Sequence, residues 1–254
     1  MLAPKSFFSF TEIPDPKHHR VYNEWHQLDH RPENLALPGV LYGERWVRTP
    51  DCKSQHTVRS PLDSLHYVNV YWYTEPVNEA IHRWAELAER SLHWGRRPDL
   101  LWARRLLMGF FTSVKGYVDP GVMVAPDVLP LRPNRGVYVT ATEVTEPASP
   151  AADAYFAHCD RVLIPDVLTI DGVAGAWTFA SDPSLGTSAI PPLKAGLRVQ
   201  LYFLDLDPVE VAPAIGELTA AAEATHAGHV RDIYRGPFRA IVPWEYDWFD
   251  TPTG

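Results

Sequence analysis

One stretch near the N-terminus gathers side chains that can transfer protons. Five polar residues recur three or four positions apart: Tyr22, His26, Asp29, His30 and Glu33. At about 100° per residue, this spacing places them on one side of a helix. Histidine suits acid–base catalysis because its pKa lies near neutrality. We therefore predict that His30 acts as base or acid, that Asp29 orients its imidazole, and that His26 is its partner.

The same residues also match a metal site. His26 and His30 are spaced i, i+4 and Glu33 follows, and two histidines with a carboxylate can hold zinc or iron. Pro32 disfavours helical geometry in the residue before it, so the direction of the Glu33 carboxylate stays open. A metal site is therefore an alternative, and the leading prediction needs no metal and no cofactor.

The sequence contains an internal repeat. Three blocks match in the same order with a nearly constant offset: residues 9–13 with 140–144, 32–40 with 165–173, and 67–72 with 198–203. Such self-similarity predicts a duplication. We expect a first module over residues 1–118, a proline-rich linker over 119–134, and a second, degenerate module over 135–254.

The repeat indicates which way the first helix faces. At the positions of the two histidines and Asp29, the second copy has Cys159, Val162 and Leu163. A helix side with these residues should face the sheet. We therefore expect His26, Asp29 and His30 to point inward, where unpaired polar groups are costly and mark a candidate site. A solvated polar helix face is the alternative interpretation.

Periodicity predicts the same element order in both copies. In the first copy we expect strands at 6–13, 40–48, 65–74 and 105–118, and helices at 17–30 and 77–93. In the second copy we expect strands near 136–145, 172–181, 196–205 and 238–248, and helices near 151–164 and 208–226.

Strand–helix–strand–strand–helix–strand is the ferredoxin-like order. Helices cover only one face of such a sheet, so its other face needs a cover, which a second copy can supply by packing sheet against sheet. The predicted fold class is therefore α+β, with two tandem ferredoxin-like βαββαβ modules that form a pseudo-dimeric α+β barrel.

Aromatic strands of the first copy could line a pocket for a flat, hydrophobic substrate. The residues predicted to bind it are Tyr22, Arg45, Trp46, Asn69 and Tyr71. The alternative is that these aromatic rows only fill the core between the sheets.

The arrangement resembles the dimeric α+β barrel superfamily, and the first copy is similar to its EthD-like branch. The residues that carry the resemblance are His26 and His30, then Pro32, then residues 37–40 leading into a strand with Arg45. The resemblance implies a cofactor-independent lyase or isomerase that dehydrates, cyclises or isomerises an aromatic or polyketide-like molecule. Fold relatives also imply three alternatives: a cofactor-free monooxygenase, a haem enzyme with a histidine ligand, or a non-catalytic small-molecule binder.

Composition narrows the class of protein. The chain has 254 residues, a formal charge of −8 and two cysteines. The acidic balance argues against nucleic-acid binding, and the few cysteines suggest a reducing cytoplasm. We expect no membrane span, no dinucleotide or P-loop motif and no serine-hydrolase elbow. The expected protein is a cytoplasmic monomer or homodimer with a small hydrophobic substrate.

Overall fold

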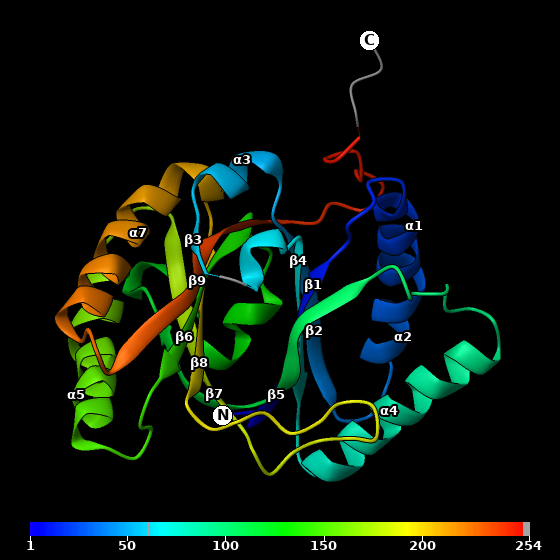
Figure 1. Cartoon of the computed structure of the whole chain (residues 1–254), viewed down its shortest axis with the longest axis horizontal. Coiled ribbons are helices and arrows are strands. Elements are labelled where there is room, and N and C mark those ends of the chain that lie inside the picture. Colours follow the sequence, from blue (N-terminus) through cyan, green and yellow to red (C-terminus); the bar gives the residue numbers. More distant parts are fainter. Residues whose placement is uncertain (60, 251–254) are drawn as a thin grey trace.

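The strands of this chain form one antiparallel sheet that closes on itself (Figure 1). The computed structural model describes residues 1–59 and 61–250. Around the ring, the strands are β2 (Val40–Val47), β4 (Tyr67–Tyr73), β1 (Lys5–Glu12), β5 (Arg104–Val118), β7 (Val173–Ser181), β8 (Leu197–Leu204), β6 (Gly136–Val144) and β9 (Val230–Ala240). Pairing of β2 with β9 closes the barrel, and the short β3 (Thr57–Val58) pairs with the same edge of β9, at Tyr234 and Arg235.

The predicted fold class, two ferredoxin-like modules packed sheet against sheet, is wrong. The strands of the two halves pair edge to edge, from Phe111 with Ser181 to Val118 with Gly175 on one side and at Trp46 with Ala240 on the other. The eight strands therefore make one closed barrel rather than two sheets. The physical reason is that closure removes exposed strand edges, which separate sheets would leave.

Helices cover the outside of the barrel in two groups (Figure 1). Over the first half lie α1 (His18–Trp25), the π-helical η1 (His26–His30), α2 (Arg31–Leu35) and α4 (Val77–His93). Over the second half lie α5 (Pro150–His158), the π-helical η5 (Cys159–Leu163), α6 (Ile164–Val167) and α7 (Pro208–Thr225).

Local signals explain where several helices begin. Ser149 accepts a hydrogen bond from the amide of Ala152 and Pro150 occupies the first turn, so α5 starts there. Asp207 caps α7 in the same way, with Pro208 in the first turn. A side-chain acceptor at the N-cap and proline in the first turn are both favourable at a helix start. The predicted helix at 77–93 coincides with α4.

The barrel interior is a core of buried aromatic and aliphatic side chains from both halves. Phe8, Val70 and Trp72 of the first half pack there with Phe179 and Leu201 of the second. Alternate residues of the same strands face outward and are covered by the helices, as a period of two requires. The barrel interior is thus filled, and cavities of functional size lie under the helices.

Two long connections cross from one half to the other. The β2–β4 connection of the first half contains α3 (Pro50–Ser54), β3 and η2 (Leu62–Ser64), and its β3 pairs with β9. The β7–β8 connection, residues 182–196, runs in the opposite direction toward α4, the lower yellow loop of Figure 1. The halves are therefore joined by more than their strand edges.

The stretch predicted as a linker, residues 119–134, is packed against the barrel. It contains η3 (Pro120–Val122) and η4 (Pro126–Leu131), and its Leu129 is fully buried. The carbonyl of Pro126 accepts a 2.8 Å hydrogen bond from the Trp177 indole. The boundaries assigned to the two repeats stay a prediction.

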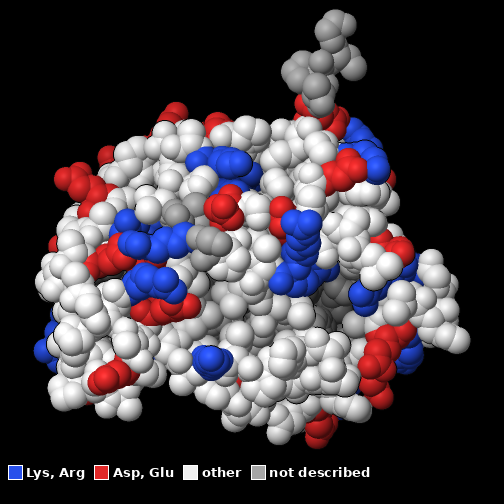
Figure 2. Space-filling model, in the orientation of Figure 1, with Lys and Arg blue, Asp and Glu red and all other residues white. Residues whose placement is uncertain are grey.

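The surface has a mixed charge. Figure 2 shows basic and acidic side chains close to one another on the face in view. Within the described ranges, none of the helices has both the length and the apolar character needed to cross a membrane.

Candidate active site

A cavity of about 760 Å³ lies between the outer face of the first-half strands and the helices above them. Its floor comes from β1, β4 and β5, one side from α1 and η1, and the opposite side from α4. The α4–β5 and β7–β8 connections close the remaining sides. A largely apolar concavity of this size is typical of small-molecule sites. We call it the first-half pocket.

The π-helical turn η1 decides which polar side chains reach the pocket. A π turn holds more residues than an α turn, so it shifts the residues that follow around the helix axis. His26 and His30 line the pocket and Asn34 is fully buried, whereas Asp29 faces outward. In η5 of the second half, Cys159 and Leu163 are likewise buried, and Val162 is 44% exposed.

The two histidines form an aromatic cluster at one end of the pocket. Their rings are nearly perpendicular with centroids 4.8 Å apart, and the His30 ring stacks on Trp25 at 4.6 Å. Nδ2 of Asn34 donates to Nε2 of His30 at 3.1 Å and to the Tyr71 hydroxyl at 3.1 Å. Asn34 thus fixes the ring of His30.

Both histidines are uncharged at neutral pH. Burial and the nearby charges of Arg97 and Arg45 lower the pKa of His30 to about 3. Burial, Arg45 and His30 lower the pKa of His26 well below its usual value. Desolvation and like charge both disfavour imidazolium, so each ring can accept a proton or donate a hydrogen bond in its neutral form.

The predicted role of Asp29 as the residue that orients His30 disagrees with the structure. The Asp29 carboxylate accepts a 2.7 Å hydrogen bond from Arg96, and Glu33 pairs with the same guanidinium. The helical spacing of 100° per residue fails here because η1 rotates both acids to the outer side. The neighbour that holds the His30 imidazole is Asn34, which the sequence analysis did not single out.

The metal alternative does not fit these side chains. Glu33 is paired with Arg96, and the described residues contain no group of three or more histidine, cysteine or carboxylate side chains placed to hold a metal. The haem alternative stays a prediction, because His26 and His30 both line the pocket.

The predicted substrate-binding residues separate into three places. Asn69 and Tyr71 line the pocket floor. Tyr22 and Arg45 lie in a buried layer behind it, with the guanidinium 4.8 Å from the centre of the phenol ring. Trp46 was grouped with them, but it faces the barrel interior, where its indole donates to Asn134 at 3.0 Å. Its position in β2, one residue from Arg45, puts it on the opposite face.

The buried guanidinium of Arg45 supports the pocket from behind. It donates to the side-chain oxygens of Asn69 and Asn23, both at 3.1 Å, and of Gln27 at 3.4 Å. These partners are uncharged amides, so the positive charge of Arg45 is not neutralised by them.

Several pocket residues were missed in the sequence. Arg97 and Leu101 come from the α4–β5 connection, Arg105 comes from β5, and residues 187–190 come from the second half. A pair of arginines directly after Gly95 was a visible signal for the first connection. Nothing local indicates that residues 187–190 reach the other half.

The second half has a smaller cavity at the corresponding place, of about 350 Å³. Cys159 lines it where the first half has His26, and Arg198 lies over the ring of Phe156 at 4.0 Å. No histidine is among its lining residues in the part of the chain that the structure describes. Among the described residues, the two cavities therefore differ in that only the first-half pocket is lined by histidines.

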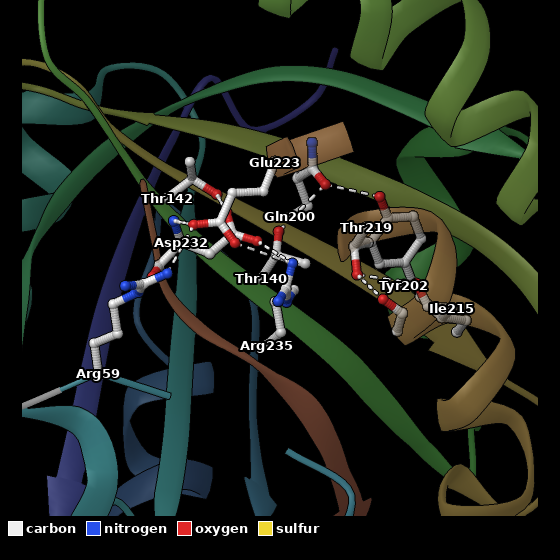
Figure 3. A network of polar contacts seen from close by, with 11 residues as sticks. Arg59, Thr140, Thr142, Gln200, Tyr202, Ile215, Thr219, Glu223, Asp232 and Arg235 are labelled. Atoms are coloured by element: carbon white, nitrogen blue, oxygen red, sulfur yellow. Dashed lines mark hydrogen bonds and ion pairs between the residues drawn. The ribbon is translucent and has the colours of Figure 1, made fainter. Parts of the chain in front are cut away.

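The second half instead holds a compact polar network under α7 (Figure 3). Thr142 donates to Asp232 at 2.6 Å, and Arg235 lies 3.1 Å from Asp232 and 3.3 Å from Glu223. Arg59, from the crossing connection of the first half, donates to Glu223 at 3.2 Å. Two acids are thus matched by two arginines.

Three solved structures share this fold over nearly the whole chain. A candidate monooxygenase from Fusobacterium nucleatum subsp. nucleatum aligns with a TM-score of 0.57 at 10% identity, over 95% of this chain and 94% of that one. A candidate chlorite dismutase aligns with a TM-score of 0.54 at 12% identity, over 98% of both chains. An anthrone oxidase-like protein aligns with a TM-score of 0.53 at 11% identity, over 95% of this chain and 92% of that one.

At these identities the likeness shows the fold alone. These neighbours do not single out the EthD-like branch that the first copy resembles in sequence. No family model matches the chain, and no curated protein matches its sequence.

Proposed function

We propose that this chain is an enzyme that moves a proton on a hydrophobic, aromatic or polyketide-like small molecule in the first-half pocket. The observation that carries the proposal is the pair of uncharged histidines, His26 and His30, at one end of a pocket with aromatic walls. Dehydration, cyclisation and isomerisation all require a proton to leave one atom and return at another. An EthD-like lyase or isomerase without a cofactor is the form of the proposal that we favour.

The hydrogen bond from Asn34 indicates which histidine donates a hydrogen bond to the substrate and which one accepts its proton. Because Nε2 of His30 accepts from Asn34, the proton of the neutral ring sits on Nδ1, which can donate to a substrate oxygen. His26 lines the pocket and its Nδ1 is buried, so it is then the proton acceptor through Nε2. The substrate carbon loses its proton to His26 while negative charge develops on the oxygen held by His30.

The positive charges around the pocket support this transfer. Arg45 and Arg105 disfavour the imidazolium form of His26, and these charges, together with that of Arg97, favour an enolate or phenolate on the substrate. The two effects oppose each other in the overall step. Stabilisation of the substrate anion by the arginines therefore offsets the low pKa of His26 in the overall proton transfer.

A cofactor-free monooxygenase is the second candidate. The observation that favours it is the same positive environment, because a stabilised substrate anion is the species that would react with dioxygen. Two fold neighbours, described as a monooxygenase and an anthrone oxidase-like protein, point in the same direction. Oxygen uptake with anthrone as substrate separates this candidate from the lyase or isomerase.

Hydrogen–deuterium exchange tests the proton step without knowledge of the natural substrate. The protein is incubated in D₂O with 2-tetralone or anthrone, two enolisable aromatic ketones, and exchange at the acidic carbon is followed by NMR. We expect catalysed exchange that falls by at least about 100-fold in His26→Ala and His30→Ala. Circular dichroism verifies that both variants are folded.

Asp29→Asn is the matched control, because it changes the same helix at a position that faces outward. We expect its exchange rate to stay within a few-fold of wild type, since it loses only an exposed ion pair. Exchange that survives in both histidine variants contradicts the proposal. Binding of the ketones without any catalysed exchange would instead make the chain a small-molecule binder.

A further inference from the structure

The first-half pocket has a positively charged end with no acidic counterpart. Arg97 and Arg105 both line it. Neither forms an ion pair with a carboxylate of residues 1–59 or 61–250, and Nε of Arg97 is buried without a hydrogen-bond partner. The neighbouring arginines differ, because Arg96 binds Asp29 and Glu33, and Arg104 lies 3.5 Å from Glu12.

Two acids also line the pocket but do not neutralise these arginines. Oδ1 of Asp99 accepts from the main-chain amide of Leu101, and Glu89 lies at the exposed end of α4. Neither approaches Arg97 or Arg105 within ion-pair distance. The two guanidinium groups act on each other instead, since burial and then the charge of Arg105 lower the pKa of Arg97. Like charges held together without a partner are destabilising unless an anion joins them.

The other walls of the pocket are mostly apolar and indicate which kind of molecule fits between them. Trp25 and Trp84 line two sides of the pocket, and Phe7, Tyr71 and Met108 lie on its floor. Such walls bury a flat, apolar body. Residues 187–190 of the second half close one end, so the size of the ligand depends on both halves.

We propose that the ligand of this pocket is an aromatic molecule with an anionic oxygen, a carboxylate or a phenolate, held by Arg97 and Arg105. This deepens the proposed function and rests on it for the reaction, since the anion would fix the molecule with its reacting carbon near His26. Arginine suits the task because its planar fork pairs with carboxylate oxygens. Arg97 and Arg105 are then binding and positioning residues, and the histidines act on the substrate.

Two probes of the same shape test the charge requirement. Isothermal titration measures the binding of 2-naphthoate and of its uncharged counterpart 2-naphthamide to the whole chain at neutral pH. We expect 2-naphthoate to bind at least about tenfold more tightly, as a charge-assisted hydrogen bond allows. Added salt should weaken the binding of the naphthoate and leave that of the amide unchanged.

Matched arginine variants locate the effect. Arg97→Gln and Arg105→Gln should each remove most of the preference for 2-naphthoate, whereas Arg104→Gln, one residue from Arg105 and paired with Glu12, should keep it. Equal affinity for the two probes, no binding of either, or a preference that survives in the Arg97→Gln/Arg105→Gln double variant overturns the proposal. Circular dichroism shows that each variant is folded.

The two proposals fail in different experiments. If the arginine variants lose the naphthoate preference but histidine variants keep full exchange, the anion site stands and the proton-transfer function is wrong. If exchange depends on the histidines while the probes bind equally, the function stands and the anion site is wrong.

Discussion

The two halves of the barrel treat their charges in opposite ways. Under α7 of the second half, Asp232 and Glu223 lie against Arg235 and Arg59, and the acids and arginines balance (Figure 3). Under the helices of the first half, Arg97 and Arg105 have no acidic partner in the described chain, and Arg45 is bonded only to amides. Equivalent places in one barrel thus hold a neutralised network and an open positive pocket.

The difference separates structure from function. A buried charge is costly unless it is paired. In the second-half network each acid lies against an arginine, which offsets the cost of burying both charges. The first half keeps unpaired arginines and neutral histidines around a cavity twice the volume of the other. Perturbed groups of this kind cluster where a ligand or a reaction compensates their cost. The network should therefore govern stability, and the pocket should govern binding.

The largest effect on stability is expected at Glu223. Glu223→Ala removes one of the two carboxylate partners of Arg235 and the partner of Arg59, and it leaves the amide of Asp232 without its acceptor. We expect a loss of about 3 kcal/mol in the free energy of unfolding, measured by urea denaturation. Glu143→Ala, which breaks an exposed pair with Arg231, is the control and should change stability by less than about 1 kcal/mol. Similar losses in both variants would remove the distinction.

A smaller effect is expected from the titration of Asp232. Burial raises its pKa from 3.8 to about 6, against the hydrogen bond from Thr142 and the charge of Arg235. The folded state therefore binds the proton more tightly than the unfolded state. The contribution of Asp232 to stability is fully present below the unfolded pKa of 3.8 and is lost as pH rises through the folded pKa of about 6.

The pH dependence due to Asp232 is measured as the difference in unfolding free energy between wild type and Asp232→Asn. Urea unfolding of wild type and Asp232→Asn is compared across this range, which cancels the other titrating groups. The stability of wild type relative to the variant should decrease as pH rises. A relative stability that is constant, or that increases with pH, means that the ion pairs of the network outweigh the burial of Asp232.

The smallest stability change is expected where function is proposed. His26 is buried and its Nδ1 has no partner, so His26→Leu should leave the free energy of unfolding unchanged or raise it by about 1 kcal/mol. The same variant should lose the exchange of 2-tetralone protons. A destabilisation of more than about 2 kcal/mol would show that His26 supports the fold, and the contrast between the halves would be weaker.

Much of the secondary structure follows from local patterns. The predicted helix at 77–93 is α4, and the predicted strands at 40–48 and 65–74 correspond to β2 and β4. Hydrophobic periodicity and the residues that begin or end an element lie within or next to that element, so they can be recognised in a single sequence. Barrel closure is different, because the pairing of Phe111 with Ser181 joins residues far apart in the chain.

The candidate site was predictable in part. His26 and His30 stand out in the sequence because the second copy has apolar or weakly polar residues at their positions, and the structure brings both to one pocket. Asp29 fits the same helical period but faces Arg96, because the π turn shifts the helix at that point. Asn34 was not singled out, because its contact with His30 depends on that shift.

Residue types and their periods thus determine most elements, the inward histidines and the acidic, aromatic character of this chain. The last strand is an exception, because it was predicted near 238–248 and is β9 at Val230–Ala240. Three features depend on the tertiary structure: the closed barrel, the arginine-lined end of the pocket and the wall formed by residues 187–190. They arise from long connections and from pairing between strands that are distant in the sequence. Those features depend on which surfaces meet after folding. Local periodicity does not predict contacts between distant segments. The sequence therefore shows which groups can react, and the folded barrel shows which of them share a pocket.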